Sequence, residues 1–157
     1  MTITEQDMAA AYGAWANALV ALSKTYEAEG IDAARALAGE AIDALYAYGD
    51  GPVLFKPTLA SGDQTFRPTR DGALAYFVGH DDVYTRDQGF GILGWRNAEF
   101  HTKATFTQGD VAIWMGRVEF TDKDGKVIEA DKSFGYKRDA AGDLRIVLHH
   151  SSLPYQP

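Results

Sequence analysis

The last strand that the sequence predicts, close to the C-terminus, carries the side chains with the clearest capacity for chemistry. It begins with apolar, branched residues, which are typical of a buried β-strand, and then turns abruptly polar before a proline ends it. Strand side chains alternate between two faces, so Val147, His149 and Ser151 are predicted on one face, and Ile146 and His150 on the other. This pattern indicates either that imidazole and hydroxyl groups reach a site or that they only cap the strand at the surface.

Two further polar residues lie where an element is bent or buried. Thr58 follows Pro57 in a short apolar strand predicted over 53–60, and the proline places that strand at a sheet edge or beside a bulge. Tyr76 lies in a nearly all-apolar helix predicted over 70–78, where a buried hydroxyl needs a hydrogen-bond partner. Each residue also has a plain structural interpretation, as a strand residue or as part of the core.

Three familiar chemistries fit the sequence poorly. A catalytic zinc ion takes about three converging ligands, and the adjacent His149 and His150 point to opposite faces. A Ser–His–Asp triad would use His149 and Ser151, but no nucleophile elbow surrounds this serine. A carboxylate base would come from Glu129 or Asp131, and both are predicted on a solvated face. The residues alone therefore predict a pocket of hydroxyls, aromatic rings and one imidazole, without naming a reaction.

Composition narrows the class of protein. The 157 residues fit one domain, 1–157, with a substantial core. A net charge of −7 argues against a nucleic-acid partner, and the absence of cysteine excludes a disulfide framework or thiol nucleophile. No apolar run is long enough to span a membrane, and the N-terminus lacks the features of a signal peptide. A cytoplasmic protein without a membrane partner is the resulting expectation.

The elements predicted in the first half of the chain are mostly helices. Apolar residues spaced three and four apart from Met8 to Tyr26 predict a long amphipathic helix. Thr4 with Asp7, or Thr2 with Glu5, would cap its start, and Gly30 would end it. A second helix is predicted from an Asp32 cap to Gly49, and the helix over 70–78 is predicted to start after a Thr69 cap.

The second half of the chain is predicted to form strands. They cover 98–107, 111–120 and 127–137 and, with the last strand near the C-terminus, make an antiparallel meander. The first of these alternates cleanly and should carry Phe100 and Phe106 on one face. Segregated helices and strands predict an α+β fold. A bent meander wrapped on a long helix would form a half-open cone with a pocket at its mouth.

Four blocks of sequence carry a resemblance to a known family. They are YGDGPVLFKPT (48–58), ALAYFVG (73–79), FGYKRD (134–139) and RIVLHHSSLP (145–154). With the order of helices and strands they resemble the NTF2-like superfamily, and more narrowly the association domain of calcium/calmodulin-dependent kinase II. In combination they look like the metal-independent branch of the iota-class carbonic anhydrases. The resemblance covers roughly residues 8–155.

The resemblance implies a fold, a reaction and a site. The fold would be an NTF2-like cone-shaped barrel, with long N-terminal helices packed on a bent antiparallel sheet. The reaction would interconvert carbon dioxide and bicarbonate without metal or other cofactor, in a homodimer formed through the outer face of the sheet. Thr58, Tyr76 and Ser151 would be the catalytic hydroxyls that hold bicarbonate. The substrate pocket would also include His149, Phe134 and Tyr136.

Two other functions stay open at this point. One is a non-catalytic ligand-binding or assembly module, as in the kinase association domain. The other is a different small-molecule enzyme on the same fold, such as an isomerase, cyclase or dehydratase, since fold alone does not fix function. An ionisable carboxylate deep in the cone would favour the second.

Overall fold

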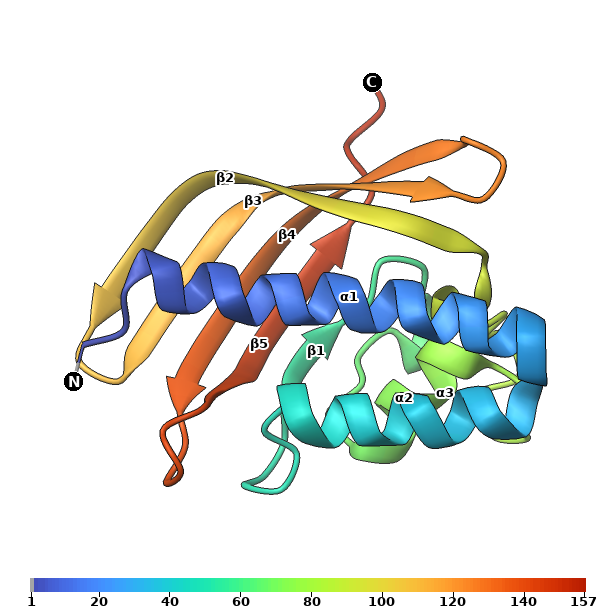
Figure 1. Cartoon of the computed structure of the whole chain (residues 1–157), viewed down its shortest axis with the longest axis horizontal. Coiled ribbons are helices and arrows are strands. Elements are labelled where there is room, and N and C mark those ends of the chain that lie inside the picture. The colour runs from blue at the N-terminus through green and yellow to red at the C-terminus, as the bar shows by residue number, and fades with distance from the viewer. Residues whose placement is uncertain (1) are drawn as a thin grey trace.

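The computed structural model describes residues 2–157 and places the helices against the concave face of one curled sheet (Figure 1). The helices are α1 (Glu5–Glu29), α2 (Ile31–Leu45) and α3 (Arg70–Val78), and the strands are β1 (Leu54–Lys56), β2 (Trp95–Gln108), β3 (Val111–Asp122), β4 (Val127–Arg138) and β5 (Leu144–Ser152). Short 3-10 turns cover Gly62–Gln64 and Phe90–Ile92. The predicted α+β class is confirmed. No helix within residues 2–157 combines the length and hydropathy needed to cross a bilayer.

The sheet has the order β1-β5-β4-β3-β2, so β1 and β2 form its two edges. The strands from β2 to β5 pair antiparallel, while β1 pairs parallel to β5 with Phe55 opposite His149. Because the edge strands are not neighbours, the sheet is curled and open, not a closed barrel (Figure 1). Pro57 follows β1 directly, which confirms the edge position that this proline predicted. Thr58 therefore lies beside the end of β5.

Local capping chemistry sets the helix starts. The Thr4 hydroxyl accepts from the Asp7 N–H at 3.1 Å and the Asp7 carboxylate accepts from the Thr4 N–H at 2.9 Å, which completes a capping box. Thr69 caps α3 through the N–H of Gly72, as predicted. The prediction of an Asp32 cap was wrong: Gly30, at a φ of 91°, ends α1 and starts α2 at once.

The second helix also ends four residues before the predicted Gly49. Its last residue is Leu45, and Tyr46 turns to extended backbone and forms a bridge with Ile146 of β5. The Ala47 N–H then donates to the Ile146 carbonyl at 2.9 Å. Pairing with a distant strand thus outweighs the local tendency to continue the helix, and it brings the buried Tyr46 beneath the sheet.

A bulge in β5 corrects the predicted alternation of the last strand. Gly135 pairs with Leu148 and Tyr136 pairs with Ile146, so Val147 has no opposite residue. The extra residue shifts the alternation by one position. Ile146 therefore faces the core at 2% exposure, while Val147 is only half-buried. The inward set of this strand is Ile146, His149 and Ser151.

A second bulge, in β2, has the same effect on Phe106. Thr102 pairs with Gly116 and Ala104 with Met115, which leaves Lys103 as the extra residue. Past this point the alternation is reversed, so Phe106 is 57% exposed on the outer face. The prediction that Phe106 shares a face with Phe100 was wrong for this reason.

The core between α1 and the sheet is centred on the indole of Trp15. Its ring centroid lies 5.7–6.5 Å from the rings of Phe77, Phe100, Phe120, Phe134 and His149, all edge-on. Such edge-to-face pairs are favoured by the aromatic quadrupole. One side chain of α1 thus contacts residues of α3, β2, β3, β4 and β5.

A buried ion pair holds the loop between α3 and β2. The Arg67 guanidinium binds both carboxylate oxygens of Asp87, at 2.7 and 2.8 Å, and donates to the Gly72 carbonyl at 2.9 Å. Its carbon lies 4.4 Å from the ring centroid of Tyr84 and 5.9 Å from that of Tyr76. Both charged side chains are almost fully buried, at 2% and 4% exposure. The pair therefore fixes the loop against the helix that carries Tyr76.

Replacing Arg67 with alanine should be strongly destabilising. The change leaves the Asp87 carboxylate buried without its partner, and we expect a loss of about 3–5 kcal/mol in the free energy of unfolding. Urea denaturation measures it. Arg117→Ala is the control, because Arg117 pairs with Glu129 and Asp131 on the solvated outer face and should cost about 1 kcal/mol or less. Equal losses in the two variants would contradict the assignment.

Candidate active site

The structure brings the three predicted hydroxyl residues together from three different elements. The Thr58 and Ser151 hydroxyl oxygens are 2.6 Å apart, and the Tyr76 hydroxyl accepts from the Leu59 N–H at 3.1 Å. All three side chains are buried, at 9%, 0% and 5% exposure respectively. Residues separated by up to 93 positions in the sequence therefore form one buried cluster, which is called the hydroxyl cluster below.

The segment around β1 positions two members of the hydroxyl cluster. Because β1 pairs in parallel with β5, Lys56 lies opposite His150 and the chain then turns at Pro57 toward Ser151. The Lys56 ammonium donates to the Ser151 carbonyl at 2.7 Å and ties the two segments together. Because Pro57 ends β1, the next residue, Thr58, leaves the strand and lies against the end of β5.

A chain of hydrogen bonds runs beside the hydroxyl cluster and crosses the core. The Trp15 indole N–H donates to the Tyr46 hydroxyl at 3.0 Å, and this hydroxyl lies 2.8 Å from His149 Nδ1. His149 Nε2 in turn lies 2.8 Å from Lys132 Nζ. The imidazole is stacked between the rings of Phe55 and Phe134, with centroids 4.6 and 4.2 Å away. We call these four residues the core polar chain.

Lys132 is a further candidate residue, which the sequence did not single out. It pairs directly with Ser151 across β4 and β5, and it is buried at 4% exposure. His149 is its hydrogen-bond partner, and within residues 2–157 it forms no ion pair with a carboxylate. The sequence did contain a signal, since strand alternation places residue 132 on the same face as Phe134.

Burial sets the electrostatics of this region. Burial, with a further contribution from the positive charge of Lys56, lowers the pKa of Lys132 to about 7. Burial and the neighbouring Lys132 charge hold the pKa of His149 well below its usual range, so the imidazole is neutral. Burial raises the pKa of Tyr76 above its ordinary value, although hydrogen bonds from Leu59 and Thr58 oppose the shift. The hydroxyls therefore stay protonated at neutral pH.

The two predicted aromatic residues have different relations to the hydroxyl cluster. Phe134 is fully buried and stacks on His149, so it forms an apolar wall of this region. Tyr136 lies beyond the bulge, opposite Ile146, and stacks on Phe134 at 5.9 Å. Its buried hydroxyl has no hydrogen-bond partner among residues 2–157. Phe134 thus lies closer to the hydroxyls along the strand register than Tyr136 does.

The carboxylates considered as a catalytic base lie elsewhere. Glu129 and Asp131 both accept hydrogen bonds from Arg117 on the outer face, at 3.1 and 2.7 Å. This confirms the solvated position predicted for them. Asp87 is buried but is held by both nitrogens of Arg67. An isomerase-type site with a free carboxylate therefore has no counterpart among these residues.

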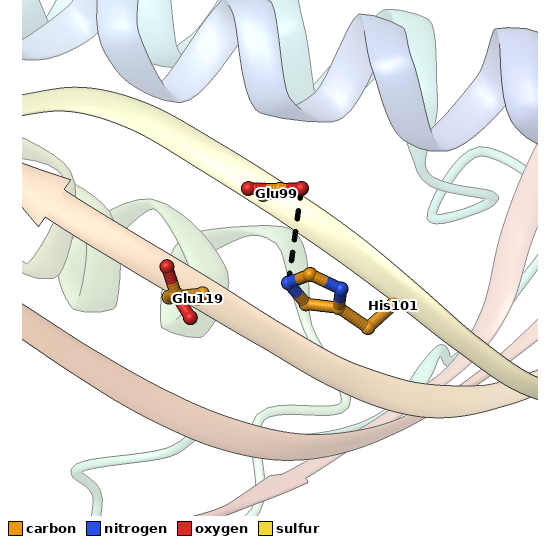
Figure 2. Close-up of side chains that lie close together, drawn as sticks. All are labelled: Glu99, His101 and Glu119. Carbon is orange, nitrogen blue, oxygen red and sulfur yellow. Dashed lines mark ion pairs between the residues drawn. The ribbon is translucent and has the colours of Figure 1, made fainter.

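A group of possible metal ligands also lies on the outer face (Figure 2). Glu99 and His101 come from β2 and Glu119 from β3, and one ligand atom of each lies within 4.8 Å of the others. Their neighbours Phe100 and Phe120 point into the core, so these side chains face outward. The sheet separates them from Ser151. His149 and His150 also take opposite faces, as predicted, with His149 buried and His150 exposed.

A large groove lies on the outer face as well. It has a volume of about 620 Å³ and is lined by side chains that include His101, Met115, Ser133 and His150. The hydroxyl cluster is buried by contrast, on the opposite side of the sheet. The candidate site is identified by buried polar groups that converge on one point. The size of a groove does not identify it.

The arrangement of helices on a curled sheet defines an NTF2-like fold. A solved NTF2-like superfamily protein from Salmonella enterica superposes with a TM-score of 0.57 at 11% identity, covering 96% of this chain and 91% of that one. At this identity the likeness is one of fold alone. It confirms the fold that the sequence blocks predicted.

Closer relatives narrow this class to one family. The family model for metal-independent carbonic anhydrase matches residues 6–153. The metal-independent carbonic anhydrase of Nostoc sp. (strain PCC 7120) is 52% identical over 154 residues, which are 98% of this chain and 75% of that protein. A crystal structure of a cyanobacterial iota-carbonic anhydrase complexed with bicarbonate has a TM-score of 0.98 at 51% identity, covering 99% of this chain and 95% of that one. The chain therefore belongs to the metal-independent carbonic anhydrase family.

The ionisation of Lys132 should make the free energy of unfolding depend on pH. Its pKa is about 7 in the folded chain against an ordinary value of 10.5, so between these pH values the unfolded chain binds more protons and stability rises with pH. Below pH 7 both states are protonated and the folded state bears the full cost of a buried ammonium. The free energy of unfolding of the native protein minus that of Lys132→Met should therefore increase by roughly 1 kcal/mol per pH unit from pH 7 to 9.

Urea denaturation of both proteins at three pH values in this window measures the difference. Subtracting the variant cancels the titration of the other groups, and any constant cost of the substitution does not affect the slope. A difference that stays level or falls with pH would show that Lys132 keeps an ordinary pKa.

Proposed function

We propose that this protein hydrates carbon dioxide reversibly to bicarbonate, without a metal, at the cluster formed by Thr58, Tyr76 and Ser151. The observation that carries the proposal is the contact of the Thr58 and Ser151 hydroxyls at 2.6 Å, buried beside Tyr76. The similar cyanobacterial protein of the comparison was crystallised with bicarbonate, which is the product expected here.

The energetics constrain how hydroxyls can do this. A catalytic zinc ion lowers the pKa of bound water from about 15.7 to about 7, which corresponds to roughly 12 kcal/mol. Neutral serine and threonine hydroxyls cannot produce such a shift, and burial raises the pKa of Tyr76 further from neutrality. Catalysis here would instead come from preorganised hydrogen bonds that orient water and stabilise charge as bicarbonate forms.

Each hydroxyl has a distinct capacity in this scheme. The Tyr76 oxygen already accepts from Leu59, so its O–H is directed by a fixed backbone group and can donate to a substrate oxygen. Thr58 and Ser151 satisfy one another, and substrate would exchange this bond for bonds to its own oxygens. The apolar rings of Phe55 and Phe134, on either side of His149, would hold carbon dioxide.

Removing one hydroxyl should abolish most of the activity while the fold persists. We expect Ser151→Ala and Tyr76→Phe to lower kcat/KM for carbon dioxide hydration by about 100-fold or more, since each removes a donor to the developing charge. Stopped-flow hydration with a pH indicator, on protein stripped with a zinc chelator, measures it. Ser152→Ala is the matched control, because this neighbour lies on the opposite face of β5 and should keep full activity.

Three results would contradict the assignment. Full activity in both variants would place the reaction elsewhere. Activity lost on stripping and restored by zinc would assign the chemistry to a metal. A native protein with no activity under any condition would favour a ligand-binding module of the same fold.

We also propose that the protein is a homodimer that buries the outer face of β2 and β3. Phe106 and Ile113 pair across these strands, Met115 follows on β3, and their exposed fractions are 57%, 40% and 54%. An apolar patch of this kind on a sheet is typical of an interface. A second copy would cover it through the same face, as a two-fold interface requires.

A charge placed in this patch should dissociate the dimer. We expect Met115→Lys to convert a dimer into a monomer in sedimentation velocity at micromolar concentration, since the lysine would be buried against its own copy. Val83→Lys is the control, because Val83 is exposed in the loop between α3 and β2. A monomeric native protein at these concentrations would exclude this interface.

A further inference from the structure

Hydration of carbon dioxide releases a proton, and the hydroxyl cluster offers no group to take it. Carbon dioxide and water give bicarbonate and one proton. Serine and threonine hydroxyls do not hold an extra proton near neutral pH, and the raised pKa of Tyr76 keeps its phenol protonated. A base with a free lone pair is therefore needed beside the cluster.

Lys132 occupies the position of such a base. It lies directly opposite Ser151 in the pairing of β4 with β5, and both side chains face the core. The side chains of directly paired residues start about 5 Å apart. Its amine lies 5.0 Å from the ring centroid of Trp15 and 5.7 Å from those of Phe120 and Phe134. The ring faces attract an ammonium, but burial without a carboxylate partner costs it more, so this environment favours the neutral amine.

The direction of the core polar chain favours the same form. Trp15 N–H can only donate to Tyr46, and Tyr46 O–H can then donate to His149 Nδ1. In this tautomer His149 carries its proton on Nε2, and the Nε2–H points at Lys132 Nζ. Only a neutral amine has the lone pair that accepts this bond. In this direction the donors of Trp15, Tyr46 and His149 are all satisfied, and Lys132 accepts as a neutral amine.

The opposite direction leaves a donor without a partner. If Lys132 were an ammonium, it would donate to Nε2, and His149 would donate from Nδ1 to Tyr46. The Tyr46 oxygen would then accept two bonds, and its own O–H would have no acceptor among residues 2–157. A buried hydroxyl without an acceptor is unfavourable.

We propose that Lys132, as a neutral amine, takes up the proton released when carbon dioxide is hydrated at the hydroxyl cluster. This inference rests on the proposed function. Water oxygen bonds to the carbon of carbon dioxide, and one carbon–oxygen π pair moves onto oxygen. The proton that water loses goes to the Nζ lone pair. The products are bicarbonate and the Lys132 ammonium, so atoms and charge balance.

The core polar chain would also return the amine to its starting state. The ammonium has no lone pair for His149 Nε2–H, so protonation breaks the last bond of the chain. The charged form is therefore disfavoured and gives its proton to solvent or buffer. His149, Tyr46 and Trp15 act as positioning residues in this scheme, because they hold the amine neutral and oriented without touching substrate.

The groups around Lys132 predict the pH dependence. His149 faces it from β5 and Lys56 acts on it from β1, while α1 and β3 present the rings of Trp15 and Phe120. Lys56 is the one of these with a positive charge at neutral pH, and it lowers the pKa of Lys132 together with burial, to about 7. Activity should therefore rise with pH through a midpoint near 7.

The test compares Lys132→Met with the native protein and with Lys137→Met, an exposed lysine on the same strand. We expect kcat/KM for hydration to fall about 100-fold or more in Lys132→Met, which is the usual contribution of a general base, and its rise near pH 7 to disappear. Lys137→Met should match the native profile. Circular dichroism establishes that each variant is folded.

Two further measurements separate proton uptake from a structural role. Imidazole added to the assay should restore part of the activity of Lys132→Ala, because a small base can replace the amine, and it should have no such effect on Ser151→Ala. Lys56→Met should move the midpoint of the native profile to higher pH, since a positive charge beside Lys132 is lost. Nuclear magnetic resonance of protein labelled at lysine Cε should show a Lys132 signal that titrates with the same midpoint.

The outcomes distinguish this inference from the proposed function. If the native enzyme is active, Ser151→Ala is inactive and Lys132→Met keeps the native rate and pH profile, then Lys132 is not the base and the hydroxyl assignment stands. A carbamate signal on Lys132 under ¹³C-labelled carbon dioxide would make the amine a nucleophile and also overturn the proposal. An inactive native protein would instead remove the proposed function itself.

Discussion

The structure depends on one constraint, which is that four polar side chains carried into the core are bonded to one another there. Trp15, Tyr46, His149 and Lys132 come from α1, from the end of α2, from β5 and from β4, and each is bonded to the next. A group left unpaired at such depth would cost about 1–3 kcal/mol. The chain therefore joins two helices to the sheet, and it holds one imidazole between two hydrogen-bond partners.

The same burial gives the site its chemical character. Hydroxyls with raised pKa values, a neutral imidazole and an amine with a pKa near 7 form a site without a fixed strong charge. Low polarity strengthens each hydrogen bond that a developing anion meets. Zinc chemistry lowers the pKa of water, whereas in the proposed mechanism a site of this kind would orient water and stabilise the product as it forms. The protein's family, its hydroxyl cluster and its buried lysine agree with this picture.

The two faces of the sheet carry different properties, and bulges help to divide them. The bulge at Val147 turns Ile146 inward, so that β5 presents Ile146, His149 and Ser151 to the core. The bulge at Lys103 turns Phe106 outward, beside Ile113 of β3. One extra residue in each strand thus separates the buried chemistry from an apolar surface suited to a second copy.

The sequence by itself determined the features that depend on short-range chemistry. Caps at Thr4 and Thr69 set two helix starts, and Pro57 placed β1 at an edge, because these effects act within a few residues. Family-like blocks also named Thr58, Tyr76 and Ser151. Only the tertiary structure decided the two bulges, the early end of α2 and the burial of Lys132 against His149. These depend on the register between strands and on contacts across the core, and periodicity along the chain does not encode which distant residue will be opposite.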